Sequence, residues 1–462
     1  MLGGECLQSF RIIFRNKNLK NWRKYILISL TIKQLYNINK SDADENRPGG
    51  TGATGLPQGS REERRMNLNE EILKLADEYE SYIIDCRRKV HTFAELAMHE
   101  DKTHQMILDE AGKLGLPCEE VPTTSVIVKM DTGRPGKVVA LRADIDALPL
   151  AESETNLAGP RTCHSEQPET CHACGHDAHT AMLLGAMQVL YRMKDQLSGT
   201  VLFCFEEGEE PNSGVRALLK ALEKYHVDYC WAIHVYAELE EGKMCVDPGA
   251  RMAGATVIDV TFHGKSGHGS RPDLAASPIF CGANFLNNLC VAFGNQVTAG
   301  KTVTLGLTMF HGGDATNVIP DSARIQGTYR FFDMEEGKKC LELTKLVAEH
   351  TAAMHKCRAE FGPDSIGSPT ITDPACAAVA SRVLNEILPE GTVVSCEPWY
   401  AGESFRLWLE KYPGVFAFLG IKNEAEGYGA PHHNTKFDLN EKVLKTGAIS
   451  TVRYAVEMLG QN

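Results

Sequence analysis

Residues 174–180 place three potential metal ligands within one short stretch: Cys174, His176 and His179. Thiolate sulfur and imidazole nitrogen are the protein ligands of zinc, cobalt, nickel and related ions. Four similar side chains lie just upstream: Cys163, His164, Cys171 and His172. Two interpretations are open here. The first is a structural zinc site that uses Cys171 and Cys174 as a C-x-x-C pair, and the second is a catalytic site with an open position and a carboxylate ligand. The H-x-E and P-C-x-x-C pattern of a zinc deaminase is absent.

Carboxylates follow the next strand-like segment of the chain. The apolar run 199–205 predicts a buried strand, and it leads directly into Glu206, Glu207, Glu209 and Glu210. Four carboxylates in five positions repel one another, and a surface loop is the simple interpretation. At the carboxyl end of a core strand, where α/β sheets collect their functional groups, they are better placed to face cations.

Further histidines follow in the same order along the chain. The strand-like run 229–233 leads into His234, and His432 and His433 follow a glycine-rich loop near the C-terminus. Each histidine alone is most simply a core or surface residue. Together with the cysteine and the glutamates they form an ordered set of potential ligands.

The order of these motifs resembles the M20 metallopeptidase superfamily, and specifically its amidohydrolase subfamily. That subfamily includes hippurate hydrolases, aminobenzoyl-glutamate hydrolases, N-acetyl-diaminopimelate deacetylases and auxin-conjugate hydrolases. The resemblance covers residues 66–462. The residues that carry it are 87–91, Glu95, Glu100, 141–149, 172–179, 209–210, 234–235, 267–272, 312–321, 327–330, 402–405 and 433–438.

The resemblance implies a site for two divalent metal ions per subunit, either Zn, Mn, Co or Ni. Its ligands would be Cys174, His176, Glu210, His234 and His433. Glu209 would be the general base, because proton transfer needs a carboxylate near the metal but not bound to it. Asp177 and His179 would orient the ligands from behind, and Asp144 and Asp146 would either do the same or brace a turn.

Two assignments rest on the alignment with the family alone. His433 is preferred to His432 because the residues that follow it, 434–438, match the family segment that begins with the ligand. Glu209 and Glu210 are preferred to Glu206 and Glu207, because the family has its two glutamates after a short loop from the strand.

The chain departs from the family pattern at three places. Glu206 and Glu207 stand where the family has Gln-Pro, which predicts a more negative site. Ser404 replaces the aspartate that follows Glu403 in the family. A contact of that aspartate with the ligands or with the substrate is therefore in doubt in this chain. Ala94 replaces a proline before Glu95, with no expected effect on chemistry.

The elements that must position these residues indicate an α/β protein with a mixed sheet flanked by helices and an inserted α+β domain. Helix and strand patterns alternate over residues 66–252, the first part of a zinc-peptidase-like catalytic domain, with a helix at 70–90 and strands at 138–141 and 201–205. Residues 253–362 hold two helical and several strand-like segments, which suit a ferredoxin-like lid. Residues 363–462 return to the catalytic domain.

In the family the smaller domain mediates dimerisation and contacts the substrate. The resemblance therefore implies a homodimer or higher homo-oligomer through residues 253–362. It also implies substrate contacts by His268, Asn317 and Arg330.

Residues 1–65 do not match this pattern and carry a net charge of +6, which leaves −18 on the remainder of a chain of net charge −12. We expect a disordered extension, read from upstream or added on expression, with Met66 as the natural start. Fifteen cysteines, one of them the thiolate ligand that the resemblance implies, favour a reducing compartment, and the acidic remainder argues against nucleic acid. With no membrane-spanning run, the sequence predicts a cytoplasmic enzyme.

The predicted function is metal-dependent hydrolysis of the amide bond of an N-acyl amino acid or a similar small conjugate with a carboxylate. A dipeptidase or aminoacylase with the same site is the nearest alternative. A metal-binding scaffold without catalysis is a third possibility, but it would not need a free base such as Glu209.

Overall fold

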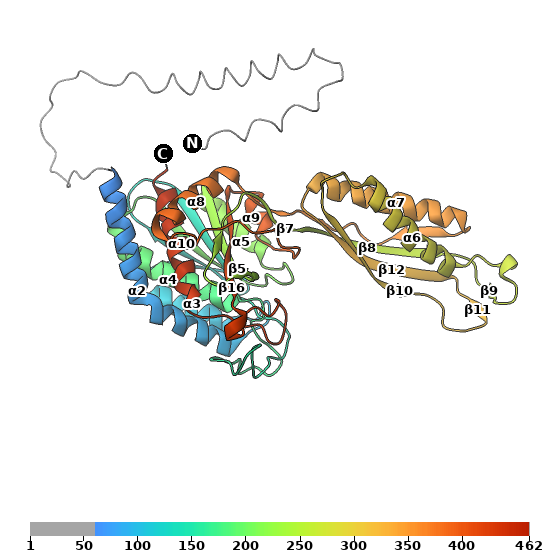
Figure 1. Ribbon diagram of the computed structural model, residues 1–462, viewed down its shortest axis with the longest axis horizontal. Helices are drawn as coiled ribbons and strands as arrows, with labels where there is room; N and C mark the ends of the chain where they lie inside the picture. The colour runs from blue at the N-terminus through green and yellow to red at the C-terminus, as the bar shows by residue number, and fades with distance from the viewer. Residues whose placement is uncertain (1–60, 462) are drawn as a thin grey trace, which may run out of the picture. The chain divides into compact units, whose positions relative to one another are not determined.

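A mixed seven-stranded sheet forms the centre of the larger part of the fold (Figure 1). The structure is a computed structural model that describes residues 61–461, with side chains from residue 65. The strand order is β1-β2-β4-β3-β5-β16-β6. The strands span Cys118–Val121 (β1), Ser125–Asp131 (β2), Val138–Asp144 (β3), Thr200–Glu206 (β4), Tyr229–Glu240 (β5), Met244–Cys245 (β6) and Gly414–Lys422 (β16). Strands β4, β3, β5 and β16 are parallel, and antiparallel strands flank them on both sides.

Alternate residues of these strands point to opposite faces of the sheet, and each face is covered by helices. One face packs on α2 (Arg61–Phe93), α3 (Asp101–Lys113), α4 (His176–Arg192), α8 (Pro374–Ile387) and α10 (Val443–Leu459). The other face packs on α5 (Val215–Leu222) and α9 (Arg406–Leu409). In β4, for example, Phe203 faces the first group of helices and Cys204 the second. Burial on both faces explains why these strands are continuously apolar in the sequence.

A second, antiparallel sheet with the order β10-β12-β8-β13 lies within residues 254–361 (Figure 1). Its elements are β8 (Gly254–His263), α6 (Pro278–Gln296), β10 (Val303–His311), β12 (Ser322–Phe331), α7 (Met334–Met354) and β13 (Arg358–Phe361). The chain order βαββαβ is that of a ferredoxin-like unit. Both helices pack on this sheet and enclose a core of their own. The predicted α/β class with a separate antiparallel unit is therefore confirmed.

Short strands complete the fold around the second sheet. These are β7 (Gly249–Met252), β9 (Gly267–His268), β11 (Val318–Ile319), β14 (Ile366–Gly367) and β15 (Thr370–Thr372). Strand β7 pairs with β15, so that the chain leaves and re-enters the larger part of the fold at one place. The exact domain boundaries at residues 252 and 362 stay predictions.

The first helix differs from its predicted bounds. Helix α2 begins at Arg61, earlier than the apolar periodicity predicts, because the polar residues that precede that pattern also favour helix. Within it, Arg65 lies 3.1 Å from Glu457 of α10. The rest of the predicted extension, residues 1–60, lies outside the described residues. No helix of the described part of the chain is both long and apolar enough to cross a membrane.

The sheet register brings the predicted site residues to one level. Asp144 at the end of β3 is the register partner of Glu206 at the end of β4. Arg142 of β3 is paired with Ala232 of β5, so that Asp144 lies level with His234. The carboxyl ends of parallel strands thus gather these side chains at one edge of the sheet.

Candidate metal centre

Four groups of His, Cys, Asp and Glu side chains could hold a metal ion, with ligand atoms within 4.8 Å of one another in each group. The groups are Cys174 with His176 and His234, Cys174 with Glu210 and His433, His176 with Glu209 and Glu210, and Asp144 with His176 and His179. The structure therefore brings together all five predicted ligands, although their roles stay predictions. Because Cys174 and His176 each belong to more than one group, the set suits two ions that share a ligand.

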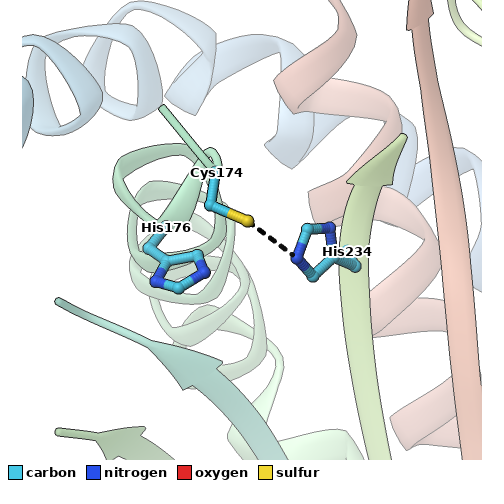
Figure 2. A group of neighbouring side chains, drawn as sticks. All are labelled: Cys174, His176 and His234. Atoms are coloured by element: carbon cyan, nitrogen blue, oxygen red, sulfur yellow. Dashed lines mark hydrogen bonds between the residues drawn. The ribbon is translucent and has the colours of Figure 1, made fainter. Parts of the chain in front are cut away.

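Cys174 and His234 come from distant parts of the chain and face each other (Figure 2). The Cys174 Sγ lies 3.6 Å from Nε2 of His234. Cys174 stands just before α4, and Gly175 at the start of that helix has a φ of +92°. A Cβ at position 175 would lie 2.3 Å from Cγ2 of Val235 in β5. Only glycine permits both this backbone conformation and this approach of the helix to the strand.

The two central histidines are each held at Nδ1, so that Nε2 is directed toward the other potential ligands. His176 donates from Nδ1 to the backbone oxygen of Asp146 at 2.9 Å, and its buried Nε2 has no hydrogen-bond partner. His234 donates from Nδ1 to the backbone oxygen of Val235 at 2.6 Å. Such contacts fix the tautomer that metal coordination requires.

Glu210 lacks a full set of hydrogen-bond partners, and Cys174 is a buried thiol. The buried Oε1 of Glu210 accepts no hydrogen bond, although it lies 3.2 Å from Nε2 of His433. Burial raises the pKa of the Cys174 thiol well above its ordinary value. A bound cation would complete the contacts of Glu210 and His176 and ionise the thiol. The donor set therefore fits the metal pair that the sequence predicts.

Asp146 connects two of the predicted ligands from behind. Its Oδ1 lies 3.1 Å from Nδ1 of His176, and its Oδ2 accepts the backbone N–H of Glu210 at 3.1 Å. The side chain therefore braces the ligands rather than a turn alone.

Asp144 and His179 are occupied with other contacts. Asp144 accepts a hydrogen bond from Nδ1 of His179 at 2.6 Å and one from Nη1 of Arg142 at 2.7 Å. Nε2 of His179 accepts the backbone N–H of Val235 at 2.9 Å. Burial opposes ionisation of Asp144, but the charges of His176 and Arg142 prevail and hold its pKa well below the usual range. These contacts suit residues that orient ligands.

Glu209 is a buried carboxylate beside His176 and Glu210. Its Oε1 accepts the backbone N–H of Ser404 at 2.7 Å. Burial, together with the negative charge of Glu403, raises the pKa of Glu209 well above its ordinary value. A carboxylate with a raised pKa next to potential ligands has the properties of a general base.

The two adjacent histidines near the C-terminus have different surroundings. His433 has a φ of +61° and faces Glu210. His432 packs against Trp399, with ring centroids 4.4 Å apart, and its Nε2 accepts the backbone N–H of Ala237 at 3.1 Å. Its Nδ1 lies 3.8 Å from the Cys174 Sγ and could donate a hydrogen bond to a thiolate there. This geometry suits His433 as the ligand.

Glu206 and Glu207 are buried and point into contacts with the surrounding protein. Glu206 accepts a hydrogen bond from Nε1 of Trp408 at 2.7 Å and contacts Arg142. Glu207 accepts the backbone N–H groups of Thr123 and Thr124. Neither belongs to a potential metal group of the described residues. The surrounding protein therefore engages both carboxylates, and a more negative site stays a prediction.

The three predicted substrate contacts lie in the residue range of the second sheet. His268 of β9 is exposed and is the register partner of Val318, which follows Asn317. The backbone oxygen of Asn317 accepts the N–H of Gly269 at 2.8 Å, so His268 and Asn317 are neighbours. Arg330 is half-buried in β12 and has no salt bridge within residues 65–461. No hydrogen bond or ion pair of the described residues joins these three to the metal candidates.

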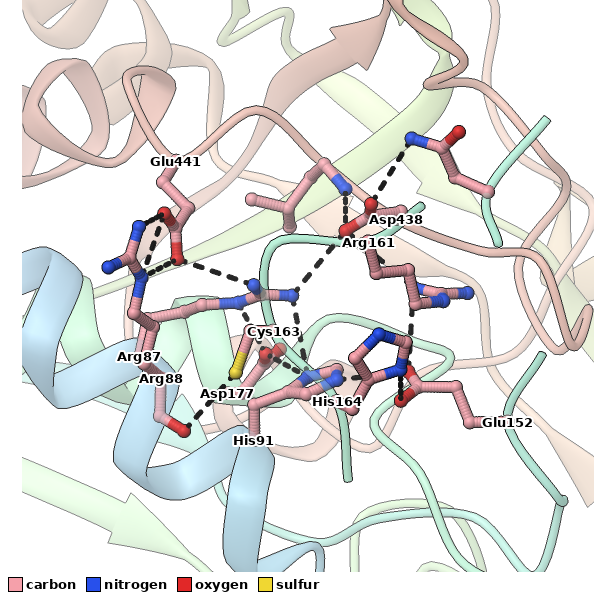
Figure 3. Close-up of polar contacts among 12 residues, drawn as sticks. Arg87, Arg88, His91, Glu152, Arg161, Cys163, His164, Asp177, Asp438 and Glu441 are labelled. Atoms are coloured by element: carbon pink, nitrogen blue, oxygen red, sulfur yellow. Dashed lines mark hydrogen bonds and ion pairs between the residues drawn. The ribbon is translucent and has the colours of Figure 1, made fainter. Parts of the chain in front are cut away.

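A buried network of charged side chains lies behind the first turn of α4 (Figure 3). Asp177 accepts hydrogen bonds from Nε of Arg87 at 2.7 Å and from Nδ1 of His91 at 2.8 Å. Nε2 of His91 lies 2.9 Å from Glu152. Nη1 of Arg87 lies 3.4 Å from Glu441. Helix α2 is thereby tied both to the ligand-bearing turn and to the segment that follows His433.

Sequence reasoning assigned Asp177 to orienting the ligands, but it named Arg87 and His91 only as part of a motif and missed their contacts with Asp177. It also missed the roles of Arg142 and Glu403. The signal that could have found Arg142 is an arginine within an otherwise apolar core strand, because a charge buried there needs an acidic partner. Nothing local marks Glu152 or Glu441, whose partners are distant in the sequence.

We predict that Asp177→Asn destabilises the protein in a pH-dependent way. Burial opposes ionisation of Asp177, but Arg87 and His91 hold its pKa well below the ordinary value. A lowered folded-state pKa stabilises the fold above the unfolded value of about 3.9, and this contribution declines as the pH falls from there toward the folded-state pKa. The variant should lose about 3 kcal/mol at pH 7, because removal of one partner leaves Arg87 buried without its main counter-charge.

Urea unfolding with a chelator present, at pH 7 and at pH 3.5, would measure this loss. The difference from wild type should shrink at the lower pH. Asp109→Asn is the matched control, since Asp109 is exposed on α3 and should change stability by less than about 0.5 kcal/mol. An equal loss for Asp177→Asn at both pH values would contradict the assigned ionisation.

Comparisons with known proteins identify the family of the chain. The model of peptidase family M20/M25/M40 matches residues 140–457. Thermostable carboxypeptidase 1 of Saccharolobus solfataricus is 34% identical, over 85% of this chain and 99% of its own length. The IAA-amino acid hydrolase ILR1-like 2 of Arabidopsis thaliana is 31% identical, over 82% of this chain and 85% of its own length.

A solved structure leads to the same family. The YxeP protein of Bacillus subtilis, a dinuclear metal-binding peptidase of family M20, superposes with a TM-score of 0.73 and 29% identity, over 83% of this chain and 99% of that one. The chain therefore belongs to the M20/M25/M40 peptidase family and is a metallohydrolase that acts on amide bonds of peptides or amino-acid conjugates.

Proposed function

We propose that the protein hydrolyses the amide bond of N-acyl amino acids or related small conjugates that carry a free carboxylate. The observation that carries this proposal is Glu209, a buried carboxylate with a raised pKa beside His176 and Glu210. A scaffold that only binds metal would not need such a base. Two divalent ions held by Cys174, His176, Glu210, His234 and His433 would polarise the amide carbonyl and acidify a water molecule.

The contacts of Glu209 support its proposed role. The Ser404 N–H holds one carboxylate oxygen, which leaves the other able to accept a proton from the attacking water. Glu209 then delivers this proton to the leaving nitrogen, so that the amine departs as a neutral group. The Asp146 contacts keep His176 and Glu210 in place during these transfers.

A carboxylate on the substrate would be recognised by a cation outside the metal centre. Arg330 is half-buried and has no salt bridge within the described residues, so its charge is available to an acid. His268 and Asn317 are neighbours that can donate hydrogen bonds to the substrate. These three contacts are part of the proposal.

Peptide hydrolysis is the second candidate, as in a dipeptidase. It is favoured by the similarity to a carboxypeptidase of Saccharolobus solfataricus. Other relatives, such as the N-acetylcysteine deacetylase of Bacillus subtilis at 30% identity, favour N-acyl amino acids.

The first test is a panel of hippurate, N-acetyl amino acids, aminobenzoyl-glutamate and a dipeptide. Chelator-treated protein should be inactive, and Zn²⁺, Mn²⁺, Co²⁺ or Ni²⁺ should restore turnover, because the ions supply the carbonyl activation. Turnover of acylated amino acids above that of the dipeptide would support the first candidate. Turnover that survives complete metal removal would contradict both.

Glu209→Gln tests the assignment of the base. The amide cannot accept the water proton, so we expect a loss of turnover of about 10³-fold or more with both metals retained. Metal content by mass spectrometry and kcat are the measurements. Glu207→Gln serves as the control, because within residues 65–461 its carboxylate accepts hydrogen bonds only from Thr123 and Thr124. A near-wild-type rate for Glu209→Gln, or loss of its metals, would refute the assignment.

A second copy of the chain is the proposed partner, paired through the residue range 253–362. Strand β10 is an edge strand of the second sheet, and its Met309 and Phe310 are exposed. Phe280 on α6 is also exposed, at 70%. An exposed apolar edge strand is a ready template for another strand. Light scattering should give the mass of a dimer or higher oligomer, and a monomeric mass would contradict the proposal.

A further inference from the structure

Arg142 is a fully buried cation at the centre of several acidic contacts behind the proposed base. Its Nη1 lies 2.7 Å from Asp144, and its Nη2 lies 3.0 Å from Glu206 and 3.1 Å from Glu403. The same Nη2 donates to the hydroxyl of Ser404 at 2.9 Å. One guanidinium therefore balances three carboxylates, and the fourth contact is a neutral hydroxyl.

Ser404 connects this cluster to Glu209 by two different groups. Its hydroxyl donates to Oε1 of Glu206 at 2.5 Å, and its backbone N–H donates to Oε1 of Glu209 at 2.7 Å. Glu206 is itself fixed on its other oxygen by Nε1 of Trp408 at 2.7 Å. The position of the Ser404 amide, and hence the orientation of Glu209, depends on how firmly Glu206 holds the hydroxyl.

The chemistry of the two positions makes them interdependent. A fourth carboxylate at position 404 would face Glu206 across hydrogen-bond distance, with the same single arginine to balance both. A neutral amide at position 206 would leave Arg142 with less opposing charge. The two departures from the family pattern, at 206 and at 404, are thus in direct contact and compensate each other in charge.

We propose that Glu206 and Ser404 form a coupled positioning pair that fixes the Ser404 amide on the carboxylate of Glu209. The pair acts through Glu209 and does not touch the substrate. The inference rests on the proposed role of Glu209 as base. It identifies the acidic residue at 206 as part of the machinery that orients the base.

The test is a double-mutant cycle with Glu206→Gln, Ser404→Asp and both together, measured on metal-loaded protein with the best substrate of the panel. Each single change should lower kcat by about tenfold or more with little change in KM, because a misplaced base slows proton transfer without weakening binding. The double variant restores one carboxylate and one neutral partner, and its kcat should recover at least about tenfold over Ser404→Asp.

Ser404→Ala provides a second measurement that does not depend on added charge. It removes the hydroxyl, keeps the amide, and should lower kcat by about tenfold at full metal content. Ser450→Ala is the matched control, since Ser450 is a buried serine of α10 whose hydroxyl donates to the oxygen of Thr446 at 2.8 Å. It should leave kcat unchanged.

The outcomes separate this inference from the proposed function. A double variant no better than Ser404→Asp, or wild-type kcat per metal-loaded site in Ser404→Ala, would overturn the positioning pair alone. A purely structural role would give lower unfolding midpoints with unchanged kcat. Absence of turnover by the metal-loaded wild type would overturn the proposed function and the inference together.

Discussion

The compensation of buried negative charge by two arginines is the interaction on which the rest of the site depends. Arg142 and Arg87 are both fully buried, and each contacts several carboxylates. Charges removed from water are costly unless they are paired. Arg142 stabilises the acids at the ends of β3 and β4, and Arg87 stabilises those behind α4. Acidic residues can therefore be buried on both sides of α4, close to the predicted ligands Cys174 and Glu210, which are themselves negative when ionised.

These two arginines also explain how distant segments meet. Arg142 contacts Glu403 from the C-terminal part of the chain, and Arg87 contacts Glu441 from the segment beyond His433. In the sequence, the second sheet lies between β3 and α2 on one side and the segments that carry Glu403 and Glu441 on the other. Ion pairs across this insertion fix the returning chain, so that His433 reaches Glu210.

Much of the fold could be predicted from the sequence because the strong signals are local. The buried strands 138–144 and 200–206 each contain a continuous apolar run, 138–141 and 201–205, and the βαββαβ order of residues 254–361 follows from alternating periods. The five ligands were predicted from the order of the motifs along the chain, and the fold places these motifs close together. The structure brings them together because parallel strands end at one edge.

The remaining features depend on contacts between residues far apart in the sequence. Glu206 reads as part of an acidic run, yet its partners are Arg142, Ser404 and Trp408. His432 reads as an alternative ligand, yet it packs against Trp399. The helix that begins at Arg61 lacks the apolar period that would have marked its start. In each case the neighbouring sequence does not indicate the structure, which depends on tertiary packing.

Gly175 shows how a steric contact can govern a coordination geometry. The missing side chain lets the start of α4 rest on Val235 of β5, and this contact sets how far Cys174 stands from His234. A methyl group there would act as a spacer between helix and strand and would widen the gap between two potential ligands. The distance between two potential metal ligands therefore depends on one hydrogen atom of Gly175 and one methyl group of Val235, neither of which belongs to a ligand.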